Sequence, residues 1–132
     1  MTASIHRVRV GYADTDQAGV CHHAAYLRFL EQARVEHWRE RGLDYRGWER
    51  SSRLGLPVVD VHVRYRAPAR FDDLLEIETW VGQSSLATLR YDSLVRVGER
   101  VLTEAQIKVA CVGLDDGQLR RMPPEVIEAA RR

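Results

Sequence analysis

Reactive side chains gather in one stretch of the sequence, YADTDQAGVCHHAAYLRFLEQAR, which runs from Tyr12 to Arg34. Ahead of an apolar segment it holds carboxylate, thiol and imidazole groups on Asp14, Asp16, Cys21, His22 and His23. Such groups act in proteins as nucleophiles, as general acids or bases, and as metal ligands. The stretch is therefore open to four interpretations: a carboxylate catalyst, a Cys–His nucleophile, a metal site, or only the entrance to a helix.

The spacing of these residues bears differently on each interpretation. Aspartate favours turns and helix entrances, so Asp14 and Asp16 have a structural explanation beside a catalytic one. Catalytic Cys–His pairs meet across a fold rather than as chain neighbours, which favours Cys21 as a small buried side chain. A metal ion needs three or four converging ligands, and the sequence has no H-E-x-x-H or C-x-x-C spacing. A metal site is therefore the least favoured interpretation.

The main chain just before the helix offers a further chemical group, the backbone amide. Gly19 permits a ligand to approach the main chain closely, and Val20 follows it. The first N–H groups of a helix have no partner within the helix and, helped by the helix dipole, can hold a developing oxyanion. A plain turn glycine is the alternative, and the sequence alone leaves both open.

The elements that must position this stretch follow from the hydrophobic pattern. Residues 4–12 alternate as a short strand does, with every second residue from His6 to Tyr12 on one face. Over residues 23–41 apolar side chains recur at helical spacing and cover more than half of the helix surface, which predicts a largely buried helix. Gly42 stands where such a helix ends.

The rest of the chain is predicted to be mainly strands. A helical turn and loop are expected in residues 43–57, followed by four alternating segments and a short C-terminal helix with Pro124 in its first turn. The GER connection and the DDGQ turn favour antiparallel hairpins. We therefore predict an α+β fold in which one long central helix is wrapped by a curved antiparallel sheet of about five strands. One helix leaves the other sheet face uncovered, which favours an oligomer.

Charged side chains give less specific signals. Glu31 and Arg34 lie three residues apart on the helix and are expected to form a local, structural ion pair. Arg64, Arg66 and Arg70 lie close together around the segment YRAPARFDD. Such a cluster suits phosphate groups, but a solvated face is the simpler explanation for any one arginine.

Composition and charge exclude several classes of protein. The length of 132 residues predicts a single domain over residues 1–132, and the net charge of +1 gives no sign of nucleic-acid binding. Two cysteines make no disulfide framework, so a cytoplasmic location is expected. No apolar run approaches the ~20 residues of a membrane span, and the N-terminus lacks a signal-peptide core.

The whole stretch closely resembles the signature of hot-dog-fold acyl-CoA thioesterases of the 4-hydroxybenzoyl-CoA thioesterase and YbgC-like type. The shared pattern is Tyr-x-Asp-Thr-Asp-x-x-Gly-Val, then His and Tyr, then Glu-x-Ala-Arg, and this chain carries it between Tyr12 and Arg34. The later segment VRYRAPARFDDLLEI is similar to a strand-turn-strand segment of the same family. The resemblance extends over roughly residues 5–114, and its motif is long and specific.

This resemblance implies a fold, an assembly and a reaction. Family members wrap an antiparallel sheet round a long helix and pair through their sheets into homodimers, many of which form homotetramers. The active site lies at the dimer interface. The implied reaction is hydrolysis of an acyl-CoA thioester to the free acid and CoA, without a metal or a bound cofactor. A non-catalytic acyl-CoA or acyl-carrier-protein binding module, a hot-dog dehydratase and a metal hydrolase remain as alternatives.

The resemblance also implies roles for particular residues. Asp16 would be the catalytic carboxylate, as nucleophile or general base, and His23 would orient groups or handle protons. Tyr12 would lie near the site. The backbone N–H of about His23 would polarise the thioester carbonyl, while Gly19 and Val20 would shape its approach. The motif does not fix the residues that grip the CoA phosphates, for which the candidates are Arg64, Arg66, Arg70 and Arg90.

Overall fold

A five-stranded antiparallel sheet and one long helix dominate the structure, a computed structural model that describes residues 2–132. The sheet has the strand order β1-β4-β5-β6-β3, and each neighbouring pair is antiparallel. Its strands are β1 (Ser4–Arg9), β3 (Val58–Tyr65), β4 (Leu74–Ser84), β5 (Thr88–Val97) and β6 (Arg100–Ala110). The α+β fold, a long helix against a curved sheet of five strands, is therefore as predicted.

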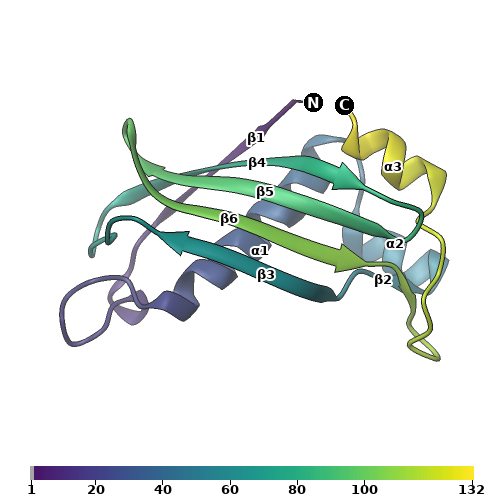
Figure 1. Cartoon of the computed structure of the whole chain (residues 1–132), viewed down its shortest axis with the longest axis horizontal. Helices are drawn as coiled ribbons and strands as arrows, with labels where there is room; N and C mark the ends of the chain where they lie inside the picture. The colour runs from purple at the N-terminus through teal and green to yellow at the C-terminus, as the bar shows by residue number, and fades with distance from the viewer. Residues whose placement is uncertain (1) are drawn as a thin grey trace.

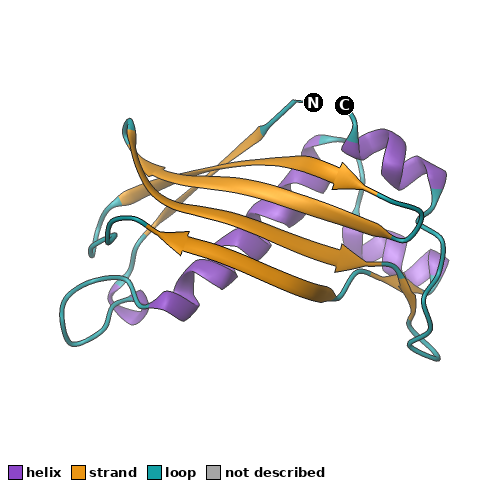
Figure 2. Cartoon of the chain, in the orientation of Figure 1, coloured by secondary structure: helices purple, strands orange, loops and turns teal. Residues whose placement is uncertain are grey.

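The helices are α1 (His23–Glu40), α2 (Tyr45–Ser52) and α3 (Pro124–Ala130), with a short 3-10 turn, η1, at Tyr12–Asp14. Figure 1 shows α1 crossing one face of the sheet diagonally, with α2 and α3 near one end of it. Two very short strands, β2 (Leu54–Gly55) and β7 (Val112–Gly113), pair near α2 and were not predicted from the sequence. Figure 2 shows the opposite face of the sheet without a covering helix in the described chain.

The helix α1 begins and ends close to its predicted limits. Gly42 follows it with φ of +80°, a left-handed conformation that glycine adopts without steric cost, which explains why the helix stops there. Seven residues of α1 are buried: Ala25, Tyr26, Phe29, Leu30, Ala33, His37 and Trp38. Leu27, another apolar residue of α1, is 42% exposed. The buried stripe is thus narrower than predicted, because only one side of α1 meets the sheet.

The strand β3 forms one edge of the sheet and is paired only with β6. Its neighbours cover it poorly, so apolar side chains are exposed along it, among them Val59 at 55% and Val61 at 45%. The outer edge of β3 has no strand beside it in the described chain. This long, partly apolar edge is a surface that proteins normally cover or pair.

The two ends of the described chain meet beside the C-terminal end of α1. The backbone N–H of Thr2 donates to the carbonyl of Arg132 at 3.1 Å. Arg41 binds both segments, since its guanidinium donates to the carbonyl oxygens of Thr2 and Arg132. Both ends of the described chain therefore lie at the end of α1 opposite to the reactive stretch, as Figure 1 shows.

None of the helices within residues 2–132 combines the length and the apolar character needed to cross a membrane.

Candidate active site

The loop that precedes α1 is closed by hydrogen bonds around Asp16. Its backbone N–H donates to the carbonyl of Val20 at 2.9 Å, and its carbonyl accepts from the N–H of Gly19 at 3.0 Å. The carboxylate oxygen Oδ1 accepts from the N–H groups of Ala18 at 2.8 Å and Val20 at 3.4 Å. Within residues 2–132 we find no hydrogen bond to the other oxygen, Oδ2. The carboxylate is thus held by one oxygen and leaves the other for a ligand.

Gly19 makes this loop geometry possible. Its φ of +81° lies in the left-handed region, where side chains with a Cβ are strained. Val20 then pairs with Arg70 in an isolated antiparallel bridge, which fixes the loop against the segment that joins β3 to β4. The two residues predicted to shape the approach to the site therefore set the conformation of the Asp16 loop.

The other aspartate of the motif, Asp14, has a structural environment. It is buried, and its carboxylate forms an ion pair with Arg28 of α1 while accepting from the N–H of Gly11 at 2.9 Å. Its carbonyl accepts from the N–H of His22 at 2.9 Å. Asp14 therefore ties the loop to the helix, and its carboxylate is already engaged.

His23 is the first residue of α1, and two contacts hold it against the end of β3. Its ring meets the ring of Tyr65 edge to face, with centroids 4.7 Å apart. The hydroxyl of Tyr65 donates to the carbonyl of His23 at 3.0 Å. No side chain in the described part of the chain caps this end of the helix. The N–H of Ala25 donates to the carbonyl of His22, whereas we find no partner within residues 2–132 for the N–H groups of His23 and Ala24, which are therefore available to an oxygen atom of a ligand.

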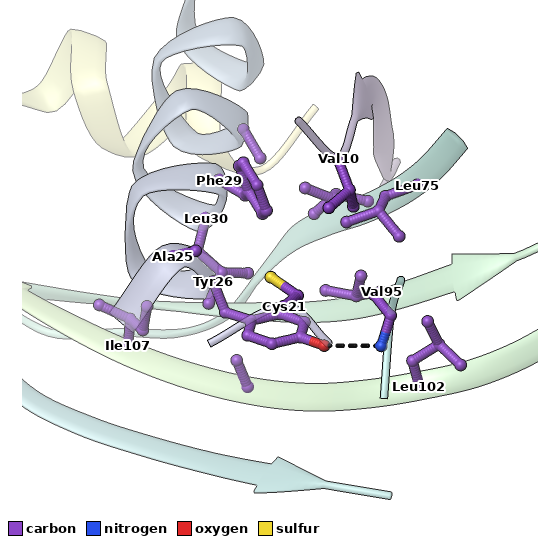
Figure 3. Close-up of a cluster of buried hydrophobic side chains, with 14 residues drawn as sticks. Val10, Cys21, Ala25, Tyr26, Phe29, Leu30, Leu75, Val95, Leu102 and Ile107 are labelled. Carbon is purple, nitrogen blue, oxygen red and sulfur yellow. Dashed lines mark hydrogen bonds between the residues drawn. The ribbon is translucent and has the colours of Figure 1, made fainter. Parts of the chain in front are cut away.

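A pocket of about 220 Å³ joins these groups. It is lined by Asp16, Val20, Cys21, His23, Tyr26, Tyr65, Arg66, Ala67 and Pro68. The structure thus brings together Asp16, Val20, His23 and Arg66 of the predicted set. It adds Tyr26 and Tyr65, which sequence reasoning did not assign to the site. Tyr26 is positioned by the N–H of Ala69, which donates to its hydroxyl at 3.2 Å, and Figure 3 shows this ring beside the sulfur of Cys21.

Cys21 lies in the wall of this pocket but is poorly suited to nucleophilic attack. Burial, reinforced by the negative charge of Asp14, raises the pKa of its thiol to about 11. The thiolate, which is the reactive form, is therefore scarce at neutral pH. No group of three or more His, Cys, Asp and Glu side chains suited to a metal ion is found in residues 2–132.

Several predicted residues lie elsewhere. Tyr12 is 78% exposed, does not line the pocket, and stacks on Phe71 with ring centroids 3.9 Å apart. Arg64 lies on β3 and borders a separate pocket that includes Trp80 and Gln106. Arg90 on β5 is held by Asp92 through two hydrogen bonds of 2.8 and 2.9 Å.

Two arginines remain close to the loop. Arg66 lines the pocket and forms an ion pair with Glu104 at 2.9 Å, while Arg70 is joined to Val20 through the backbone.

The expected ion pair between Glu31 and Arg34 is absent from the ion pairs of residues 2–132. That prediction is wrong, because both side chains turn to a second pocket further along α1.

Comparison with known proteins agrees with the motif and the fold. A family model described as the thioesterase-like superfamily matches residues 10–130. The chain is 36% identical to an acyl-CoA thioesterase YbgC of Haemophilus influenzae, over 90% of this chain and 88% of that protein. It is also 36% identical to an acyl-CoA thioester hydrolase YbgC of Escherichia coli, over 91% and 90% of the two chains.

The solved structures add a likeness in three dimensions. A DHNA-CoA thioesterase of Staphylococcus aureus superposes with a TM-score of 0.92 at 26% identity, covering 98% of this chain and 89% of that one. The match includes the long helix and the whole sheet, as the coverage requires. The chain therefore belongs to the thioesterase-like superfamily, as a YbgC-like member with the hot-dog fold.

Proposed function

We propose that this protein hydrolyses an acyl-CoA thioester to the free acid and CoA, with Asp16 as the catalytic carboxylate. The observation that carries the proposal is the pocket in which Asp16 meets the uncapped start of α1. Attack on a thioester carbonyl requires two groups. One is a carboxylate with a free oxygen, and the other is a set of free amides that stabilises the developing oxyanion. The names of the YbgC relatives support the same reaction.

In this reaction the backbone N–H of His23 donates to the thioester carbonyl oxygen and stabilises the negative charge that develops on it. Asp16 then acts by one of two routes. As a nucleophile it forms an anhydride with the acyl group and releases CoA as a thiolate, and water afterwards cleaves the anhydride. As a general base it takes a proton from water, which attacks the carbonyl carbon directly. His23 is proposed to orient the reacting groups and handle protons, including the one that the CoA thiolate takes up.

Neither route draws on a metal or a bound cofactor, and CoA enters only as part of the substrate. Among the arginines, Arg66 and Arg70 are the better candidates for the CoA phosphates, because they border the pocket and the loop. Arg64 borders another pocket, and Arg90 is occupied by Asp92. Tyr12 keeps a proposed place near the site, outside the pocket lining.

The assembly proposed is a homodimer, with a homotetramer as its extension, in the cytoplasm. The exposed edge of β3 supports it, because a second copy of this strand could continue the sheet and cover Val59 and Val61. Tyr65, at the end of β3, borders the pocket. The pocket would therefore lie at the dimer interface.

A thiol-release assay over a panel of acyl-CoAs tests the reaction. We expect the wild type to release CoA, and Asp16→Asn to lose on the order of a hundredfold or more in kcat while keeping its thermal unfolding midpoint. Asp115→Asn is the control, since it alters an exposed carboxylate paired with Arg53 far along the chain. Equal activity in Asp16→Asn and wild type would remove Asp16 from the mechanism.

The second candidate is a non-catalytic module that binds acyl-CoA or acyl-carrier protein on the same fold. It predicts saturable binding without release of thiol. The free oxygen of Asp16 disfavours it, since a binding module gains nothing from a carboxylate beside an anionic ligand.

A further inference from the structure

A second pocket, of about 320 Å³, lies along α1 beyond the candidate active site. The side chains of Trp38, Tyr45, Leu56, Val58 and Tyr91 give it aromatic and apolar walls, and Arg34 is the one basic residue in its lining. The pocket is lined by the second half of α1, by the start of α2, by the beginning of β3, and by one residue each of β5 and β6. It is distinct from the Asp16 pocket, with which it shares no lining residue.

Arg34 brings an unsatisfied positive charge to this pocket. Its Nη1 atom is buried and has no hydrogen-bond partner within residues 2–132. Burial lowers the pKa of its guanidinium, yet arginine stays protonated in proteins. The group therefore keeps its charge and has hydrogens left to donate.

The titratable side chains that face Arg34 leave its Nη1 atom without a hydrogen bond. Burial raises the pKa of both Tyr45 and Tyr91 to about 12, so both phenols are uncharged at neutral pH. Tyr91 is engaged with Trp38, whose Nε1 donates to its hydroxyl at 2.8 Å. Glu31 also lines the pocket and its charge attracts that of Arg34, but Glu31 is an exposed residue and forms no ion pair with Arg34. The pocket thus holds a guanidinium that forms no ion pair and whose buried Nη1 has no hydrogen-bond partner, among mainly apolar walls.

A buried guanidinium nitrogen without a partner destabilises a folded protein, because it loses its hydration without a compensating bond. We propose that the pocket is a binding site for a carboxylate, which Arg34 holds while the aromatic walls contact the apolar body of the molecule. A carboxylate matches the fork of the guanidinium in geometry and charge. The volume suits a small aromatic or short aliphatic acid.

Two sources could supply this carboxylate: a free acid, or the far end of an acyl group that carries a second carboxyl. The second source rests on the proposed function and on pairing of β3 edges. If two copies of β3 pair antiparallel about their centre, Tyr65 of one copy lies beside Val58 of the other. The active-site pocket of one protomer would then adjoin the Arg34 pocket of its partner.

Calorimetric titration of the full chain tests the site directly. Phenylacetate is the probe, and phenylacetamide is its uncharged counterpart. We expect phenylacetate to bind and the amide to bind about tenfold more weakly or worse. Arg34→Met should abolish the difference, and Arg34→Lys, which keeps the charge but loses the fork, should reduce it. Arg46→Met is the control, since Arg46 is an exposed arginine of α2 outside the pocket lining.

Thermal unfolding separates a binding role from a structural one. Without ligand, Arg34→Met should unfold at the same temperature as wild type or higher, because it removes a buried guanidinium nitrogen that has no hydrogen-bond partner. Failure of phenylacetate to bind wild type, or equal binding by Arg34→Met, overturns the proposal. A lower unfolding midpoint in Arg34→Met, with binding unchanged, would make Arg34 a structural residue.

The two sources are distinguished by comparing glutaryl-CoA with pentanoyl-CoA. If kcat/KM favours glutaryl-CoA and Arg34→Met removes that preference, the distal carboxylate of the acyl group is the ligand. If phenylacetate binds but wild type shows no such preference, a free acid is the ligand. The titration needs no turnover, so absence of thioesterase activity would overturn the proposed function and leave this test intact.

Discussion

The guanidinium of Arg28 pairs with the carboxylate of Asp14, only two residues before Asp16. This pair buries the first aspartate of the motif and leaves the second beside an open pocket. Two carboxylates that look alike in the sequence therefore have different environments. Their substitutions should separate stability from activity.

Asp14→Asn should lower the free energy of unfolding by about 1–3 kcal/mol, because the charged partner of Arg28 and an acceptor for Gly11 are weakened together. Asp16→Asn should change stability little, since its carboxylate is exposed. Urea unfolding followed by circular dichroism measures both. Equal stability of the two variants would contradict the structural role of Asp14.

Tyr65→Phe should lower kcat/KM about fivefold, because the hydroxyl that holds the carbonyl of His23 is lost. Tyr12→Phe is the matched change, since its ring stacks on Phe71 outside the pocket. We expect it to retain most activity. A larger loss of kcat/KM in Tyr12→Phe than in Tyr65→Phe would indicate that Tyr12, and not Tyr65, contributes to catalysis. Steady-state kinetics on one acyl-CoA is sufficient.

Cys21 should resist alkylation in the folded protein. With a thiol pKa of about 11, only roughly one molecule in a thousand carries the thiolate at pH 8. Iodoacetamide should therefore modify it slowly until the chain is unfolded, as mass spectrometry would record. Cys21→Ala should stay active. Rapid alkylation at pH 8 that abolishes activity would revive the Cys–His interpretation.

His37 should make stability depend on pH below neutrality. Burial, with the nearby charge of Arg41, lowers its pKa to about 4, whereas the unfolded chain takes up the proton near 6.5. Its contribution is therefore complete above pH 6.5 and is lost as pH falls towards 4, by roughly 3 kcal/mol in all. His37→Phe should flatten this slope between pH 6.5 and 5, measured by urea unfolding. A slope unchanged from wild type would contradict the assignment.

Val61→Lys should weaken self-association, because a charge on the exposed edge of β3 opposes pairing with a second copy. Leu86→Lys is a suitable control, since Leu86 is 67% exposed in the turn between β4 and β5. Sedimentation velocity distinguishes monomer from dimer. A wild type that sediments as a monomer would remove the dimer from the proposed function.

The elements were predictable where local chemistry decides them. Gly42 ends α1 because its φ is positive, and Pro124 opens α3. The exposure of β3 was not predictable, because the alternating pattern indicates which way side chains point and not whether another element covers them. The absence of an ion pair between Glu31 and Arg34 was not predictable for a similar reason. Helical spacing permits such a pair, but the pocket gives Arg34 another environment.

The site was only partly predictable. Asp16 and His23 lie within one motif, which a sequence can display. Tyr65 reaches His23 from 42 residues away, a contact that only the fold creates. Arg90 looked free, although Asp92 stands two positions along the same strand face, a spacing that could have revealed their pairing.

The backbones of Thr2 and Arg132 are hydrogen-bonded, so the two ends of the described chain lie side by side. A short linker could join these ends, and the chain could be reopened at the turn of Gly98 between β5 and β6. In such a circular permutant the hairpin of β5 and β6 would be divided between the two new ends. The helix α1 would move to the middle of the sequence, and β6 would be synthesised before it. The order of synthesis would therefore change, while the contacts in the folded protein stayed the same.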